Sequence, residues 1–487
     1  MTVLSALNTT QIQGLTTTTI AGLSTSAIAS LATTQIQALT TTQVAALKAT
    51  HIAALATTQL AALETTDLAV LNTTQMRALA ASQVAALSTT QVGAMTTTQV
   101  AALSVAQVAA LETTDVAALT TTQVGALASS QIGALTTAQA RALETTDLAV
   151  LTTTQVRGLS SAQVAALTTT QMGALTTTQV GAMTTTQVAA LGSAQVSALT
   201  TTQLGALTST QMGALTAAQF RGFDTTDIAT LTTTQVAGLT PTQLAALTTT
   251  QIQALETTDL GALTTTQLTG LTTAQMAVLS TTQIGALSTT QVAGLAARLV
   301  AAINTTDVAA LTTTQVGALT STQMAVLGTA QLRAMETTDL AVLTTTQIRA
   351  LGASKLAALS TTQIGALTTT QIGALATTQL AGLTSTQVVA LNTTQLGALS
   401  STQVGGLTTA QLRGLDTTDV AGLTTTQVGG LTATQLASLT TTQLAALETT
   451  DLAVLNTTQI RGIAASGIGA LTTTQVGALT TTQVAAL

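Results

Sequence analysis

Apolar and polar positions recur along the chain with a period of eight residues. The repeat has the form TTTQVGAL, as at Thr120–Leu127, and with Asn8 as position 0 sixty such octads run to Leu487 without insertion or deletion. A truncated unit, Met1–Leu7, precedes them. Position 7 is nearly always Leu, position 4 is usually Val, Ile, Leu or Met, and position 3 is Gln in 45 octads. Because a repeat this regular is the signature of a stacked array, we expect a single continuous octapeptide-repeat solenoid over residues 1–487.

Each octad carries the signals of a helix N-terminus. Thr at position 0 followed by Gln at position 3 is a capping box, in which each side chain accepts a hydrogen bond from the backbone N–H of the other residue. The Leu before the cap and the Val after the Gln form a hydrophobic staple. The single proline, Pro241, follows Thr240 at the first helical position, where a missing N–H does no harm. Since positions 4 and 7 then share one face, we predict an all-α solenoid of very short capped helices.

Two other folds compete with this one. A two-sided β-solenoid with two octads per coil is the alternative, since Thr and Val are good strand formers. Its weakness is the odd spacing of positions 4 and 7, which puts them on opposite faces of a strand. A continuous helix is excluded, because eight residues cover about 2.2 turns and rotate the apolar stripe by roughly 80° per octad. The octads Ala80–Leu87 and Ala296–Ile303 favour helix, and in the second Leu299 replaces Gln, so we expect an irregularity at 296–303.

Charged residues follow a longer period of sixteen. All 17 acidic residues fall in nine octads with Asp at position 3, and these Asp residues are separated by multiples of sixteen. Eight arginines stand at position 5 of other octads, each ten residues after or six residues before such an Asp. We therefore predict coils of two octads, sixteen residues each, and an Asp–Arg column along one edge. The residues of this structural charge column are Asp67, Arg77, Arg141, Asp147, Arg157, Arg221, Asp227, Arg333, Asp339, Arg349, Arg413, Asp419, Asp451 and Arg461.

Composition narrows the classes of function. The chain is 46% hydrophobic and 6% charged, with a net charge of -6. Its few basic residues are scattered, which argues against nucleic acid as a partner, because nucleic-acid binding needs concentrated positive charge. The absence of cysteine excludes a disulfide framework and a thiolate metal site. No apolar run approaches the ~20 residues that span a bilayer, and the N-terminus shows no cleavable signal peptide.

Candidate chemistry is sparse. His51 is the single histidine and has no partner that would orient it for catalysis, so we expect no enzyme, no catalytic residue and no cofactor. The acidic octads offer carboxylates of the kind that bind calcium, but each supplies only two, so no metal site is expected. Asn at position 0 creates Asn-Thr-Thr sequons as a by-product of a preferred helix cap.

The phrase L-[ST]-x-x-Q-[VIL]-x-[AG]-L, as in Leu39–Leu47, resembles the Thr/Gln-rich octapeptide repeats of very long bacterial surface proteins, which are adhesin-like or filament-forming. The resemblance implies an extracellular or cell-surface filament, stalk or adhesin spacer that self-associates end to end or belongs to a longer array. Leu239–Leu247 is similar to the opening helix of transcription-activator-like DNA-binding repeats but lacks their base-reading loop, so DNA binding is not implied. The alternative function is a flat Thr face that binds ice or another ordered surface.

Overall fold

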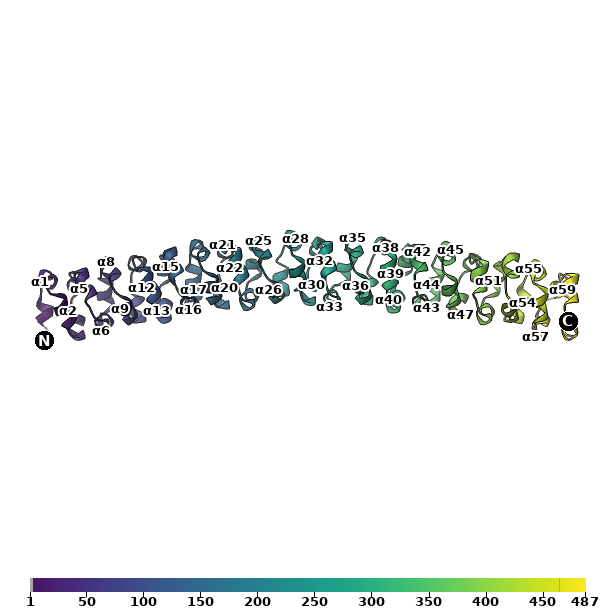
Figure 1. The fold of residues 1–487 in the computed structure, drawn as a ribbon, viewed down its shortest axis with the longest axis horizontal. Helices are drawn as coiled ribbons and strands as arrows, with labels where there is room; N and C mark the ends of the chain where they lie inside the picture. The colour runs from purple at the N-terminus through teal and green to yellow at the C-terminus, as the bar shows by residue number, and fades with distance from the viewer. Residues whose placement is uncertain (1–2, 464) are drawn as a thin grey trace. The chain divides into compact units, whose positions relative to one another are not determined.

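The described part of the chain, residues 3–463 and 465–487 of a computed structural model, has helices as its regular secondary structure. It forms two compact units, Met1–Leu247 and Thr248–Leu487, which are built in the same way. Within each unit the short helices follow one another in octad order (Figure 1). These residues hold α-helices, one 3-10 helix at Val3–Ala6, and no strand. The prediction of an all-α repeat solenoid is confirmed, and the β-solenoid alternative is wrong.

Every α-helix occupies the same part of its octad. Helix αn begins at residue 8n + 1, which is position 1, from α1 (Thr9–Gln13) to α60 (Thr481–Val484). Helices of five residues, which end at position 5, are the commonest. The helices that end at position 4 are α10 (Ala81–Val84), α27 (Ala217–Phe220), α33 (Thr265–Leu268), α37 (Ala297–Val300), α58 (Ala465–Ile468) and α60. Those that end at position 6 are α2, α6, α9, α12, α13, α15–α17, α19–α22, α26, α30–α32, α36, α39–α41, α43, α51, α54, α55 and α57.

The capping box predicted from the sequence is present. In α15 (Thr121–Ala126), Thr120 has an extended backbone and accepts from the N–H of Gln123, whose side chain accepts from the N–H of Thr120. Leu127 at the other end is again extended, so the chain leaves one helix and enters the next cap within two residues. Pro241 takes the first helical position of α30 (Pro241–Ala246). Short helices follow because each octad restarts its helix with a new cap.

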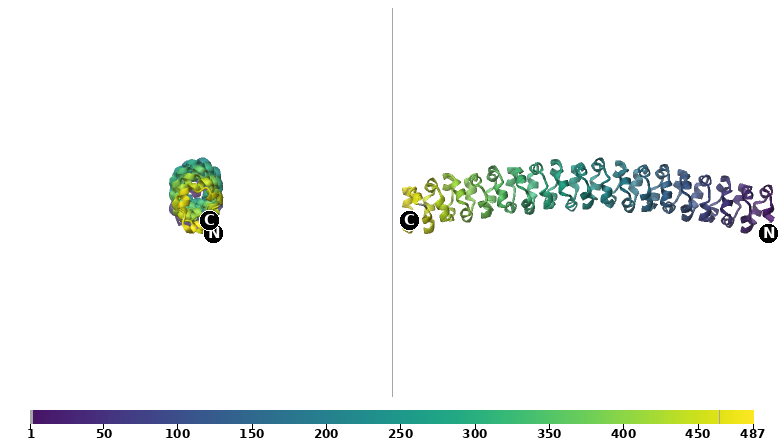
Figure 2. Two further views of the ribbon diagram at one scale, coloured as in Figure 1. Left: turned by 90° about the vertical axis from the view of Figure 1, so that its right-hand side faces the viewer. Right: turned by 180° about the vertical axis from the view of Figure 1, so that it is seen from behind.

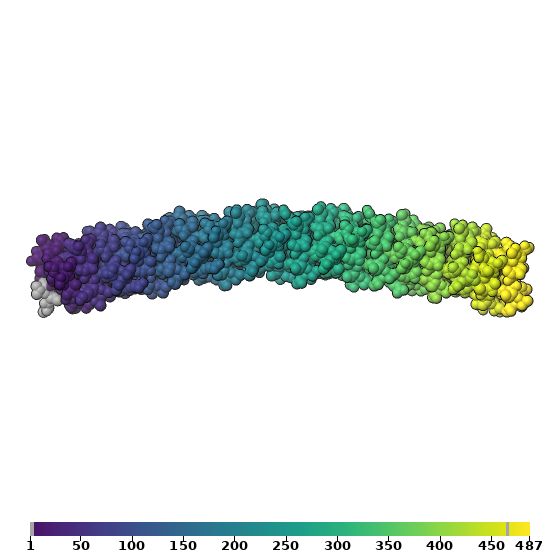
Figure 3. Space-filling model, in the orientation of Figure 1, coloured from purple at the N-terminus to yellow at the C-terminus, as the bar shows by residue number. Residues whose placement is uncertain are grey.

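Positions 3, 4 and 7 build the core of each unit. In the octad of α15 the exposed fraction is 0% for Val124 and 4% for Leu127, and Gln123 is buried with them. The Thr residues at positions 0, 1 and 2 of this octad are exposed. Phe220 and Phe223 take the same core positions and meet edge to face, with ring centroids 5.1 Å apart. On the face shown in Figure 3 neither unit is opened by a deep cleft.

Successive turns of the coil place octads three and four apart in contact. Helix α12 (Thr97–Ala102) packs against α9 (Thr73–Ala78) and α15, three octads on either side. Glutamine side chains bridge separations of 28, 30 and 31 residues, which reach the octad four places earlier. One turn therefore holds between three octads and four. Figure 2 shows the short helices following one another along each unit. The predicted coil of two octads is wrong.

The failure of that prediction has a physical reason. Three positions in eight are buried, so each octad offers a broad inner face. Two helices per turn would leave the edges of this core open to water, whereas three to four helices surround it. The sixteen-residue spacing of the charged residues reflects the order of acidic and basic octads along the sequence. It does not indicate which octads are in contact.

The octad Ala296–Ile303 keeps its place in the second unit. Its helix α37 has four residues and no side-chain cap. It still packs against α34 (Thr273–Ala277) and α40 (Ser321–Val326), three octads away on each side. The irregularity expected at 296–303 is therefore local and does not interrupt the order of helices.

Candidate functional site: a glutamine ladder

The glutamine at position 3 connects two octads through one buried amide. Gln123 Oε1 accepts from the N–H of Thr120 at 2.8 Å, which caps its own helix. Its Nε2 donates to the carbonyls of Val92 (3.2 Å) and Met95 (2.7 Å), in the octad of α11 (Thr89–Gly93). The last carbonyls of a helix have no partner inside the helix. One side chain therefore caps the start of one helix and the end of the helix four octads earlier.

The same bonds recur through both units. In the first, Gln43 Nε2 donates to the carbonyls of Ile12 (2.9 Å) and Leu15 (2.7 Å). In the second, Gln483 Nε2 lies 2.7 Å from the carbonyls of both Leu452 and Leu455. We call this set, the position 3 glutamines and the carbonyls at positions 4, 5 and 7 four octads earlier, the glutamine ladder. A buried polar group left without its partner costs about 1–3 kcal/mol, so each rung ties neighbouring turns together.

His51 and Lys355 replace glutamine at position 3 and keep a hydrogen-bond donor there. The N–H of Lys48 donates to His51 Nδ1 at 3.1 Å, so the proton of the neutral ring is on Nε2. That Nε2 lies 3.0 Å from the carbonyl of Leu23, the position 7 residue four octads earlier. Lys355 Nζ donates to the carbonyl of Ala325 in the same way. His51 is thus a rung of the ladder.

The irregular octad supplies its rung from the adjacent position. Leu299, where Gln would stand, is fully buried. Arg298 donates instead to the carbonyls of Leu271 (2.8 Å) and Thr269 (3.0 Å). These are positions 7 and 5 of the octad that a glutamine at 299 would reach. The lost amide is therefore replaced by a guanidinium.

The position 3 aspartates differ, because a carboxylate accepts hydrogen bonds but does not donate them. Each is buried, with exposed fractions from 1% at Asp115 to 9% at Asp419. Asp115 Oδ2 accepts from the N–H of Glu112 at 3.2 Å, which keeps the capping half of the glutamine's role. Burial raises the pKa of all nine carboxyl groups above the ordinary value, and the neighbouring carboxylate at position 0 raises it further in eight. The N–H of the cap residue opposes this rise in pKa at the same eight sites.

The position 5 arginines lie on the outside. Arg77 Nε donates to the carbonyl of Ala102 at 3.3 Å, and Arg157 Nε to that of Ala182 at 2.9 Å, each 25 residues further along. Arg221, Arg333 and Arg349 make the corresponding bond. The other three arginines of the predicted column are Arg141, Arg413 and Arg461. All eight have exposed side chains.

The structure therefore places the two halves of the predicted charge column on different sides of the coil wall. Asp67 and Arg77 belong to successive octads of one turn, with Asp67 buried and Arg77 exposed. Asp147 is buried, whereas Arg141 and Arg157, which lie six residues before it and ten residues after it, are exposed. Asp227, Asp339, Asp419 and Asp451 are also buried, and the arginines at the same spacings from them are exposed. The aspartates replace ladder glutamines inside the wall, and five of the arginines link the outer surfaces of helices three octads apart.

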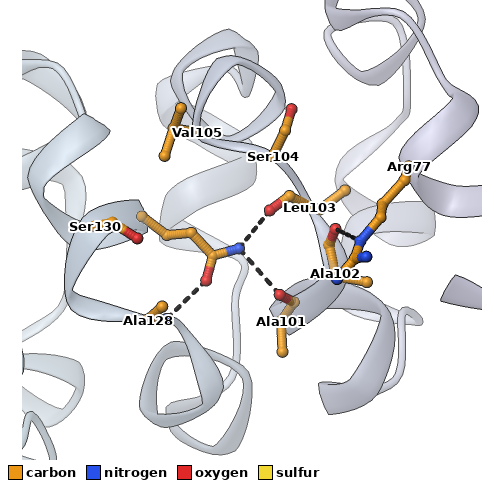
Figure 4. Close-up of a pocket in the computed structure, with 9 residues that line it drawn as sticks. Arg77, Ala101, Ala102, Leu103, Ser104, Val105, Ala128 and Ser130 are labelled. Carbon is orange, nitrogen blue, oxygen red and sulfur yellow. Dashed lines mark hydrogen bonds between the residues drawn. The ribbon is translucent and has the colours of Figure 1, made fainter.

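A shallow hollow of about 380 Å³ opens beside one of these arginines (Figure 4). Arg77, Ser104, Val105 and Ser130 stand around it, and Gln131 also lines it. The polar atoms of Gln131 are already used, since Nε2 donates to the carbonyl of Leu103 at 2.7 Å and Oε1 accepts from Ala128 at 2.6 Å. The hollow is thus a gap between octads of the wall.

Residues 3–463 and 465–487 contain no cluster of three or more His, Cys, Asp or Glu side chains placed to hold a metal ion. The helices within these ranges are also too short to cross a membrane.

Comparison with known proteins identifies the repeat. The family model described as ALTTAQ repeat matches residues 60–217, 222–297, 300–369 and 372–487 in overlapping segments. No curated protein matches the chain. The motif ALTTAQ stands intact at residues 134–139, where it joins positions 6 and 7 of one octad to the cap and the ladder glutamine of the next. Because the matches cover most of the chain, the protein belongs to the ALTTAQ repeat family.

Proposed function

We propose that the protein is a structural repeat protein that serves as a filament, stalk or adhesin spacer at the cell surface or outside the cell. The observation that carries this proposal is the glutamine ladder, which joins each turn to its neighbours by the same few bonds. A stack of this kind gains length by adding octads, and each addition brings its own rung, cap and core residues. The compositional resemblance to bacterial surface repeats supports the location.

A mechanical measurement tests the structural role. Each unit is held by many similar contacts between neighbouring turns, so pulling on the two ends of the chain should unfold it in many small steps. Single-molecule force spectroscopy of the full chain is expected to give a long series of low, closely spaced transitions. One cooperative rupture that extends a whole unit at once would contradict the proposal.

Self-association is the second part of the proposal. Because the glutamine rungs share the same donors and acceptors, a ladder can be continued by another array of octads in register, including one from another copy of the chain. Electron microscopy over a range of concentrations is expected to show particles that lengthen by end-to-end addition. Particles of one length at every concentration would argue against assembly, and surface protease treatment of cells would separately test location.

The alternative of an ice-binding Thr face would use the exposed Thr residues at positions 1 and 2, such as Thr121 and Thr122. We favour the structural role, because these residues lie in the first turn of a short helix and not in a flat row of strands. Absence of thermal hysteresis is the expected result in a droplet freezing assay.

A further inference from the structure

The aspartates at position 3 remove the donor from the glutamine ladder. At Asp115 the carboxyl group stands where Gln would face the carbonyls of Val84, Ala85 and Leu87, four octads earlier. Equivalent carbonyls at the next ladder position along the first unit, Val92 and Met95, receive Gln123 Nε2 at 3.2 and 2.7 Å. A carboxylate cannot make these bonds, since all its oxygen atoms are acceptors.

Other replacements show what the position demands. His51, Lys355 and, from the adjacent residue, Arg298 all donate to carbonyls of the octad four places earlier. The remaining exceptions are Gly467, which has no side chain, and Thr19 and Ala27 in the second and third octads. Only the aspartates put an acceptor opposite these acceptors.

The aspartates also interrupt the ladder at successive rungs. Asp115 and Asp147 are four octads apart, which is the separation of one rung from the next along the ladder. The pairs Asp307 with Asp339 and Asp419 with Asp451 repeat this spacing in the second unit. Two adjacent rungs therefore change together.

We propose that these aspartates are proton-operated joints of the stack: each protonated carboxyl group donates its single O–H to a carbonyl of the octad four places earlier, and each ionised one withholds that hydrogen bond. The proton comes from solvent and is bound at the oxygen that does not accept from the cap N–H. A carboxylic acid then keeps the acceptor contact of the glutamine amide and supplies one of its donor contacts. Because Asp is one methylene shorter than Gln, the bond draws the two octads closer together.

Few other charges face Asp115 and Asp147, the two aspartates on adjacent rungs in the first unit. Asp115 lies on α14 (Thr113–Ala117), which packs against α11 and α17 (Thr137–Ala142). Of these two, only α17 carries a charged residue, the exposed Arg141. Glu112 at the cap is the one charged neighbour that influences the pKa of Asp115.

Asp147 has a similar setting. It lies on α18 (Thr145–Ala149), which packs against α15 and α21 (Thr169–Ala174), and neither of these helices carries a charge. Glu144 at its own cap is close to it, and the octad that its side chain faces holds Glu112 and Asp115. Since the surrounding charges are mainly negative, they favour proton uptake, and burial raises the pKa of both aspartates in the same direction.

The sign of the pH dependence follows. The pKa of each aspartate is higher in the folded chain than in the unfolded chain, so the folded state binds protons more readily. The resulting stability is fully present below the unfolded-state pKa and is lost as pH rises through the folded-state pKa. The stack should tighten as the pH falls from neutral toward about 4.

Hydrogen exchange of the full chain provides the test. In the wild type, amides of residues 80–87 and 112–119, corrected for intrinsic exchange, should be about two- to tenfold better protected at about pH 4.5 than at about pH 7, which is the change expected from one added hydrogen bond. The double variant Asp115→Asn/Asp147→Asn donates at every pH, so this gain should disappear. The matched control, Glu112→Gln/Glu144→Gln, alters only exposed position 0 carboxylates and should retain most of it.

A second measurement uses the wild type alone, so it does not depend on whether the variants fold. With aspartate carboxyl carbons labelled in the wild type, the nine position 3 signals should titrate above the ordinary pH range of an aspartate. A pH-dependent gain that survives in the Asn variant would overturn the proposal. So would restoration of neutral-pH protection by calcium in the wild type but not in the Asn variant, which would make the joint a cation site.

Discussion

At the scale of the residue, the position 3 glutamine has two roles and only one was predicted. The capping box accounts for the Oε1 atom and is satisfied equally by Glu. Glu never stands at position 3, although it occupies position 0 six times. The absence of Glu from position 3 indicates that the amide N–H₂ group is needed there. The sequence does not show which residues accept from this group, because the acceptors are backbone carbonyls.

Replacing a ladder glutamine by glutamate isolates the donor. In Gln123→Glu the carboxylate still accepts from Thr120 but no longer donates to Val92 and Met95, so the free energy of unfolding should fall by about 1–3 kcal/mol. Urea denaturation followed by circular dichroism measures the change. The same substitution at Gln37, an exposed position 5 residue, should have little effect. Equal losses in the two variants would show that charge alone is responsible.

At the scale of the element, the boundaries of the short helices were predictable and their contacts were not. The cap at position 0, the proline at 241 and the extended Leu at position 7 follow directly from the octad. The number of helices per turn depends on how wide an inner face each octad buries. Predicting that width requires knowing whether position 3 is buried along with positions 4 and 7. Because Gln is polar, the octad pattern alone did not indicate that it lies in the core.

Close approach at position 6 gives a prediction at this scale. A Cβ atom on Gly238 would overlap the backbone oxygen of Ser209, three octads earlier, so Gly238→Ala must displace one turn against the next. We expect a fall of about 1–3 kcal/mol in the free energy of unfolding, typical of overpacking. Gly125→Ala is the control, since nothing lies within 4 Å of its added Cβ, and helix propensity should make it neutral or stabilising. Similar urea midpoints for the two variants would contradict the assigned contact.

At the scale of each unit, the structure depends on register more than on any individual octad. Contacts join octads three and four places apart, so every octad meets partners of nearly the same sequence wherever it stands. The continuity of one array from 1 to 487 remains a prediction from the octad register. The sixteen-residue charge spacing failed as a guide because repeated octads copy their spacing along the chain whether or not they touch.

Deletions that keep or break register test this view. Removing the whole octad Thr168–Leu175 shifts later octads by one place, so that Gln179 should donate to the carbonyls of residues 136–143 in place of 144–151. Cap, rung and core are all rebuilt, and thermal unfolding by circular dichroism should change little. Removing only Thr168–Gln171 joins Leu167 to Met172 and loses one cap and one rung, which should cost about 2–4 kcal/mol. Hydrogen exchange should then show faster exchange confined to residues near the deletion. Equal damage from both deletions would mean that particular pairs of octads, and not their common register, hold the stack together.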